Sequence, residues 1–155
     1  MSYIDKNLMN GENLVYLGKL HWVIFLRPII WFIVAIMFFV FGGNSTTSSV
    51  GVLFILIALI SAIDSFIQYR TSEFGITNKR LIAKAGFIRR RSTEVLLNQV
   101  EGIQVNQGIL GRILGFGSIT FGGTGGTKDP YPNIAAPFEF RKKAHEQIAV
   151  VQGSK

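Results

Sequence analysis

The sequence predicts a helical hairpin long enough to cross a membrane, joined to a small, mainly β domain. Two long apolar runs, residues 22–41 and 50–67, are separated by an uncharged stretch over residues 42–49. Each run is close to the roughly 20 residues that cross about 30 Å of hydrocarbon. From residue 73 onward, short alternating apolar segments are broken by Gly, Asn and Pro, which is typical of strands and turns.

The basic residues predict how the hairpin is oriented. No Lys or Arg lies between the two runs, whereas Lys6 and Lys19 precede the first run and seven Lys or Arg lie between residues 70 and 91. The positive-inside rule therefore predicts a multi-pass protein of the cell (inner) membrane with both termini in the cytoplasm. A cleaved signal peptide is the competing interpretation of the first run, but the long basic flank and the second apolar run favour a retained hairpin.

Each apolar run carries one charged residue about a turn from its cytoplasmic end, Arg27 in the first and Asp64 in the second. A charge within hydrocarbon is costly and usually has a partner. An antiparallel hairpin places these two residues at similar depth, which favours an intramembrane pair within one hairpin or between neighbouring chains. The alternative is that Asp64 snorkels to the interface, as a long Arg side chain also does. Pro28 is expected to kink the first helix.

Length and composition predict three segments: an N-terminal cytoplasmic arm over residues 1–21, a hairpin over 22–69 and a cytoplasmic β domain over 70–155. The chain of 155 residues has no cysteine, which excludes thiolate metal sites and thiol catalysis and suits a reducing compartment. Its two histidines, His21 and His145, have no carboxylate at ligand spacing. No Ser-His-Asp pattern is present, so we expect no enzyme, no metal, no cofactor and no small-molecule substrate.

The net charge of +7 lies entirely in residues 70–155, which hold thirteen Lys or Arg against six Asp or Glu. A basic cytoplasmic domain tethered to a bilayer is attracted to anionic headgroups by about 1 kcal/mol per basic residue near the surface. The topology signal together with solubility explains the excess as well as attraction to lipid does. Nucleic acid is not an expected partner, since the chain has no recognisable binding motif for it.

Strands are expected over residues 73–77, 80–84, 88–97, 100–105, 117–121 and 133–136, with residues 14–17 as either a strand or an interfacial segment. Apolar residues recur at helical spacing after Pro137, which predicts a C-terminal amphipathic helix. The glycine-rich segment 108–115 is expected to be a turn, or a single helical turn, that serves packing. Its Arg112 is a candidate partner for Glu94 or Glu101.

Several motifs together resemble a known family, the small bacterial membrane proteins with a pleckstrin-homology-like (PH-like) domain, also called the YdbS-like group. Besides the paired apolar runs, the resemblance rests on the segments Thr77–Ile82 with Gly86, Glu94–Gln99, Val105–Gln107, Gly111–Gly117 and Gly122–Thr127 with Pro137-Phe138. It implies a small β-barrel or sandwich of about seven antiparallel strands with a C-terminal capping helix. The family has no established enzyme activity, and phosphoinositide binding does not carry over, because no headgroup motif is matched.

The clearest candidate binding residues are Lys84, Arg89, Arg90 and Arg91, because Arg binds phosphate oxygens in a bidentate manner. In a strand, Arg89 and Arg91 share one face and Arg90 points to the other, so a solvated strand or a generic membrane-facing patch is the alternative.

We therefore expect a non-enzymatic membrane-anchored adaptor that presents its basic β domain to copies of itself, to another membrane protein or to anionic lipid. Small residues on the second run, Gly51, Ala58, Ser61, Ala62 and Ser65, are candidates for a close helix contact. The alternative hypothesis is a subunit of a membrane transport or channel assembly that uses Arg27 and Asp64.

Overall fold

The computed structural model describes residue 4 and residues 7–86, 91–123 and 130–153. The chain divides into two compact units. Residues 1–21 and 71–155 form the first, called the β unit below, and residues 22–70 form the second, called the hairpin unit. In this division the N-terminal arm belongs to the same compact unit as the C-terminal half.

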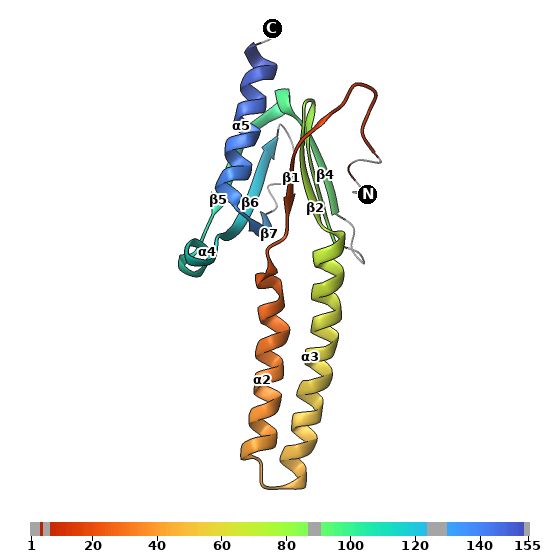
Figure 1. Ribbon diagram of the computed structural model, residues 1–155, viewed down its shortest axis with the longest axis vertical. Helices are drawn as coiled ribbons and strands as arrows, with labels where there is room; N and C mark the ends of the chain where they lie inside the picture. Colours follow the sequence, from red (N-terminus) through yellow and green to blue (C-terminus); the bar gives the residue numbers. More distant parts are fainter. Residues whose placement is uncertain (1–3, 5–6, 87–90, 124–129, 154–155) are drawn as a thin grey trace. The chain divides into compact units, whose positions relative to one another are not determined.

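The β unit contains seven antiparallel strands in two sheets and a C-terminal helix, as the PH-like fold class predicts (Figure 1). One sheet has the order β1-β2-β3-β4 and the other has the order β5-β6-β7. The strands are β1 (Leu14–Lys19), β2 (Glu73–Thr77), β3 (Arg80–Ala85), β4 (Arg91–Leu96), β5 (Val100–Asn106), β6 (Phe116–Gly123) and β7 (Pro130–Ala135). The helices are η2 (Leu97–Gln99), α4 (Ile109–Leu114) and α5 (Pro137–Gly153).

The hairpin is inserted between two neighbouring strands of the first sheet. Strand β1 precedes the hairpin in the sequence and β2 follows it, yet the two pair antiparallel, with Lys19 opposite Glu73 and Leu17 opposite Gly75. The segment that left two interpretations open is therefore a strand. Because β1 is an edge of its sheet, β2 would be the exposed edge without it.

Aromatic side chains fill the space between the two sheets. Phe74 and Tyr131 meet edge to face, with ring centroids 5.6 Å apart, and Phe121 packs against the same tyrosine. The fully buried Phe140 of α5 reaches Phe121 and closes the open side of this core. Gly18 of β1 leaves room for it, since a Cβ there would lie 3.0 Å from the Phe140 ring. Helix α5 thereby caps the sheets, as predicted.

The hairpin unit consists of η1 (Trp22–Phe25), α2 (Leu26–Phe41) and α3 (Ser45–Thr71). The turn is shorter than the predicted loop, because α3 begins at Ser45 and only three residues connect the helices. Asn44 initiates α3, where the Thr47 hydroxyl donates to the Asn44 carbonyl oxygen. Pro28 lies in the first turn of α2, where no intrahelical hydrogen bond is lost. A 3₁₀ turn, η1, directly precedes α2 at Leu26, and the kink at Pro28 stays a prediction.

Three small residues at seven-residue spacing, Gly51, Ala58 and Ser65, are buried on α3. A Cβ at Gly51 would lie 2.8 Å from the Phe39 ring of α2, and the Ser65 hydroxyl donates to the Ile24 carbonyl oxygen over 3.2 Å. Three of the five small residues that were candidates for a close helix contact are therefore buried within one hairpin.

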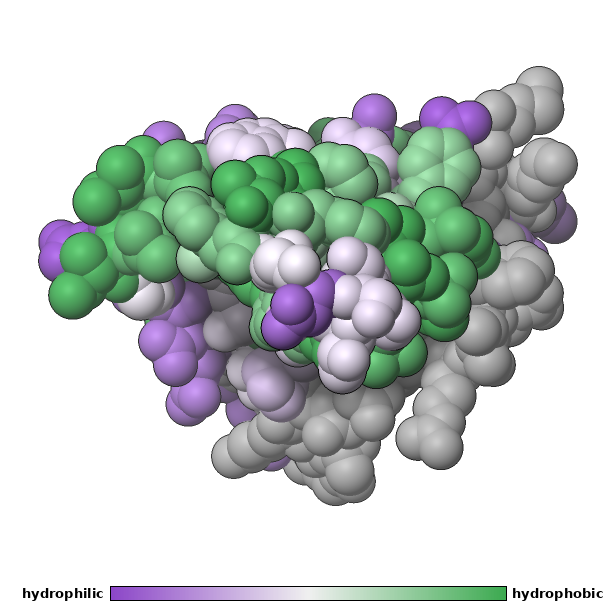
Figure 2. All heavy atoms as spheres, turned by 90° about the horizontal axis from the view of Figure 1, so that it is seen from below, coloured by the Kyte–Doolittle hydropathy of each residue, from purple (hydrophilic) through white to green (hydrophobic). Residues whose placement is uncertain are grey.

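The outward faces of both helices are apolar and exposed. Both helices are long and apolar enough to cross a membrane, and only 17% of each apolar window is buried within the structure. A core helix of a soluble protein would instead bury its apolar side chains. Figure 2 looks onto the turn between the two helices and shows mostly hydrophobic residues around its few polar ones.

Candidate interaction surface

The sheet register brings the two junctions with the hairpin to one end of the β unit. The chain leaves β1 at Lys19 and returns to β2 at Glu73, and these two residues are cross-strand neighbours. Leu20 continues the pairing into the second sheet through a bridge to Ile134, and the His21 N–H donates to the Asn133 carbonyl oxygen over 2.7 Å. We call this end, defined by His21 and Ser72, the hairpin end.

Two of the predicted basic residues lie at the hairpin end. Lys84 is opposite Glu73 on β2 and Ser92 on β4, and Arg91 begins β4 opposite Ala85. Glu73 of β2 therefore lies between Lys19 of β1 and Lys84 of β3. Opposite charges on neighbouring strands attract, so this row of three residues is electrostatically favourable. Arg89 and Arg90 lie outside the described residues. Whether these basic residues bind lipid or a partner stays a prediction.

Helix α4 also lies at the hairpin end and exposes nearly all of its apolar side chains. It is followed by Gly115 and Phe116, and the Phe116 ring stacks on His21 with centroids 5.6 Å apart. The exposed fractions are 81% for Ile109, 68% for Leu110, 75% for Ile113 and 36% for Leu114. The glycine-rich segment 108–115 was expected to serve packing. Only Gly111 does so, because a Cβ there would meet the Phe116 carbonyl oxygen.

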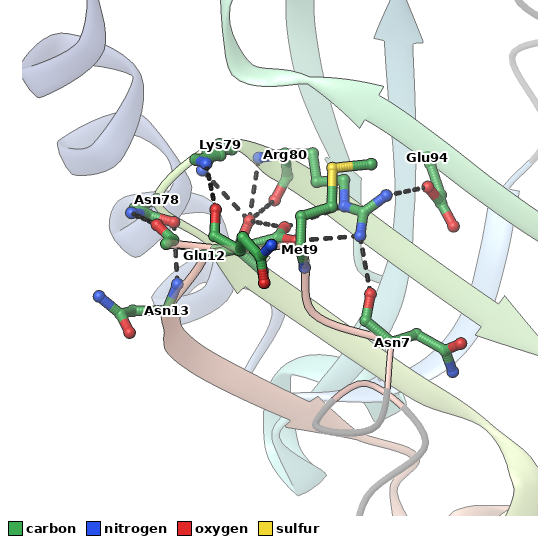
Figure 3. Close-up of polar contacts among 11 residues, drawn as sticks. Asn7, Met9, Glu12, Asn13, Asn78, Lys79, Arg80 and Glu94 are labelled. Atoms are coloured by element: carbon green, nitrogen blue, oxygen red, sulfur yellow. Dashed lines mark hydrogen bonds and ion pairs between the residues drawn. The ribbon is translucent and has the colours of Figure 1, made fainter.

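The opposite end of the β unit, called the far end, holds a cluster of ionised and polar groups around Arg80 (Figure 3). The Arg80 guanidinium donates from Nε to Glu12 Oε1 and from Nη2 to Glu12 Oε2, both over 2.9 Å. Nη1 donates to Glu94 Oε2 over 2.6 Å, and Nη2 also reaches the Asn7 carbonyl oxygen over 3.0 Å. Glu94 therefore pairs with Arg80, whereas Arg112 was the predicted partner.

Glu12 is the buried member of this cluster and has a full set of donors. Its side chain is fully buried, and the Thr77 hydroxyl donates to Oε1 over 2.7 Å while the Met9 N–H donates to Oε2 over 2.8 Å. Burial alone would raise the pKa of the Glu12 carboxyl, but the hydrogen bonds from Arg80, Met9 and Thr77 outweigh it and lower the pKa below 4.5. The bond to Glu12 likewise raises the pKa of Arg80, against the effect of burial.

The turn at residues 78–79 strengthens this attachment of the arm. The Asn13 N–H donates to Asn78 Oδ1 over 3.0 Å, and the Asn78 amide donates to the Gly11 carbonyl oxygen. Lys79 Nζ donates to the Asn10 carbonyl oxygen over 3.0 Å. The motif Thr77–Arg80, quoted above for the family resemblance, therefore joins the arm to the sheet. Among the described residues no buried side-chain nitrogen or oxygen lacks a hydrogen-bond partner.

The sequence profile of the family "Bacterial PH domain" matches residues 17–148. The chain belongs to this family. Neither a curated protein nor a solved structure gives a significant match. The matched range begins in β1, includes the hairpin unit and ends within α5, so in this bacterial PH domain the hairpin lies inside the matched segment.

Within the hairpin unit of this bacterial PH domain, Asp64 has a neighbour on its own helix. Its Oδ2 accepts a hydrogen bond from Gln68 Nε2 over 2.8 Å. Arg27 lies in the first turn of α2 and is exposed. The ion pair between Arg27 and Asp64, within one hairpin or between neighbouring chains, stays a prediction.

Two features of this bacterial PH domain were not predicted from the sequence: the buried ion pair of Glu12 with Arg80, and the exposed apolar face of helix α4. Glu12 was not singled out, because its partner lies 68 residues away in the sequence. Helix α4 was recognised as a segment, but its exposure is not visible in the residue types. In the described part of the chain, no group of three or more His, Cys, Asp or Glu is arranged to hold a metal ion.

Proposed function

We propose that this bacterial PH domain protein is a non-enzymatic, membrane-anchored adaptor. Its hairpin spans the inner membrane and holds the β unit at the cytoplasmic face. There the hairpin end presents basic and apolar groups to anionic lipid, to a second copy or to another membrane protein. The observation that carries this proposal is the pairing of β1 with β2 across the inserted hairpin.

The pairing matters because it makes the anchor part of the fold. Lys19 and Glu73 are cross-strand neighbours, so both points at which the chain joins the hairpin belong to one rigid sheet. A domain attached through a single flexible linker would sample many orientations. Two attachments on adjacent strands restrict the β unit far more and favour the presentation of one defined end.

The apolar surface of the hairpin supports a membrane location. Large side chains such as Phe32, Ile33, Ile60 and Phe66 are more than half exposed, and an apolar surface of this extent is not stable in water. Two spans return the chain to the side from which it started. The positive-inside rule then makes that side the cytoplasm.

A non-enzymatic role is supported by the chemistry of the best-formed polar cluster. Arg80 and Glu12 are buried and mutually neutralised, whereas catalytic acids and bases need a reachable substrate and an exchangeable proton. The cluster stabilises the β unit without offering either.

Single-cysteine variants test this proposal directly, because the native chain has no cysteine. Ser45→Cys reports on the turn of the hairpin and Asn98→Cys on the far end, and both positions are exposed. In intact spheroplasts, a membrane-impermeant maleimide is expected to label Ser45→Cys only, and both variants are expected to react after lysis. Labelling of Asn98→Cys in intact spheroplasts would overturn the orientation, and release of the chain from membranes by alkaline carbonate would overturn the anchor.

A further inference from the structure

Helix α4 is a six-residue helix that contributes little to the core of its own domain. Ile109, Leu110 and Ile113 are each more than two-thirds exposed. Exposed apolar side chains occur singly on many soluble proteins, but three such residues on one short helix form a contiguous patch. The only buried residue of α4 is Gly111, so this helix meets its domain through backbone and directs its large side chains outward.

The position of α4 in the β unit says what lies near it. Phe116, two residues beyond the helix, stacks on His21, and Ala136 donates its N–H to the Gly115 carbonyl oxygen over 2.9 Å. His21 is followed directly by Trp22, the first residue of the apolar hairpin. Covalent connectivity therefore keeps α4 close to the point at which the chain leaves the β unit for the hairpin.

We propose that α4 inserts its apolar side chains into the headgroup and acyl boundary of the membrane in which the hairpin is anchored, and so serves as a third contact with the bilayer. This inference rests on the proposed function, since it needs the hairpin to be in the membrane. Apolar side chains of interfacial helices are buried about 5–10 Å into this boundary. The exposed Arg112 suits the same place, because a long basic side chain covers apolar surface while its charge reaches the headgroups.

Lipid is favoured over a protein partner by size and by charge. A stable protein interface buries about 800 Å² on each partner, which six residues cannot supply. A bilayer needs no shape-complementary surface and accepts a small apolar patch. The lysines at the same end of the β unit, Lys19 and Lys84, add attraction to anionic headgroups.

Depth-dependent fluorescence quenching of the full chain in anionic vesicles tests this inference. A polarity-sensitive dye is attached to Ile113→Cys, and separate vesicles carry lipids spin-labelled either near the carbonyl groups or near the chain ends. We expect blue-shifted emission and stronger quenching by the shallow label. Asn98→Cys at the far end is the matched control, for which neither effect is expected. Ile109→Cys, at the most exposed position of the helix, replaces Ile113→Cys if that variant does not fold.

A dye at Ile60→Cys separates failure of this inference from failure of the proposed function. Ile60 is exposed near the middle of α3, so a membrane-spanning hairpin gives strong quenching there by the deep label. Quenching of the dye at Ile60 without quenching at Ile113 would show that α4 does not enter the membrane, while the hairpin still does. Loss of quenching at both positions overturns the anchor as well. If Ile113→Cys instead forms a disulfide between chains and shows no quenching, α4 contacts a second copy and the inference is wrong.

Discussion

The two ends of the β unit contain opposite kinds of surface. At the far end, Arg80 is buried and bonded to Glu12, Glu94 and a backbone carbonyl oxygen. At the hairpin end, a six-residue helix exposes its large apolar side chains, and Lys19 and Lys84 lie on either side of Glu73. The polar groups of the far end are bonded to one another, whereas the apolar side chains of α4 are exposed. In the proposed function, the far end stabilises the fold and the hairpin end makes the contacts outside the chain.

The largest effect is expected from removing the arm, because it supplies β1 and Glu12. Residues 70–155 alone should show no cooperative thermal unfolding by circular dichroism. A chain in which a short glycine linker replaces residues 22–70, so that His21 leads into Thr71, should unfold cooperatively. Lys19 and Glu73 are already cross-strand neighbours, so the linker has little distance to cover. Equal cooperativity of the two chains would show that the far end does not depend on the arm.

Arg80→Ala is expected to cost about 3–5 kcal/mol of unfolding free energy, because it leaves the buried Glu12 carboxylate without its charge partner. Urea unfolding of the chain with the glycine linker measures this cost. Glu94→Gln removes the half-exposed partner and should cost about 1 kcal/mol or less. Lys142→Ala, an exposed lysine of α5 away from the cluster, is the control, with an expected effect within about 0.5 kcal/mol. Equal losses for Arg80→Ala and Lys142→Ala would contradict the role of the cluster.

The far end also predicts a pH dependence. The pKa of Glu12 is lower in the folded protein than its ordinary value of 4.5, so its ionised form stabilises the fold. This contribution is complete above pH 4.5 and is lost as the pH falls through the lower folded pKa. Unfolding free energies measured over this range should fall less steeply in Glu12→Gln than in the parent chain. If the unfolding free energy falls equally steeply with pH in both chains, carboxylates other than Glu12 determine the loss of stability in acid.

The predicted basic residues Arg89, Arg90 and Arg91 are expected to contribute about 1 kcal/mol each to association with anionic lipid. Replacing all three with Ser should weaken sedimentation of the glycine-linked chain with anionic vesicles, and moderate salt should reduce binding by the parent chain. Lys79→Ser at the far end is the control. If Lys79→Ser weakens binding as much as the triple variant does for each charge removed, the two ends of the β unit attract anionic lipid equally.

The smallest effect is expected within the hairpin itself. Asp64→Asn keeps a side-chain oxygen that can accept the hydrogen bond from Gln68, so we expect normal membrane insertion and no change in proton leak across reconstituted vesicles. A changed leak with normal folding would favour the transport hypothesis over the adaptor.

Several features were predictable because they depend on local composition. The apolar runs, the strands after residue 73 and the helix from Pro137 follow from hydrophobic period and turn residues, and the described residues confirm these elements. Two strands differ in their bounds: the strand expected over 88–97 is described as β4 (Arg91–Leu96), and the one expected over 133–136 begins earlier, as β7 (Pro130–Ala135). The short turn at Gly42–Asn44 was not predicted, since Ser and Thr residues that read as loop instead form the first turns of α3. Hydroxyl side chains there hydrogen-bond to backbone carbonyls one turn earlier, which composition alone does not reveal.

The candidate site was predictable only in part. The sequence singled out Lys84 and the three arginines that follow, but not the exposure of α4, because an apolar residue has the same identity whether it packs in a core or faces outward. The arm was the other omission. Strand β1 of the arm is six residues long. Its stability depends on pairing with β2, which is more than fifty residues away in the sequence, and the composition of a strand does not identify its partner.

Local sequence pattern was enough to predict two apolar helices, a basic domain of short strands with a capping helix, and membership of the bacterial PH domain family through motifs spread along the chain. Three further features became visible only in the folded chain: β1 pairs across the inserted hairpin, Glu12 neutralises Arg80, and α4 lies exposed beside the chain junction. The physical reason is that period and composition act over neighbouring residues, whereas these three features join groups that are distant in sequence and are selected by packing and charge in three dimensions.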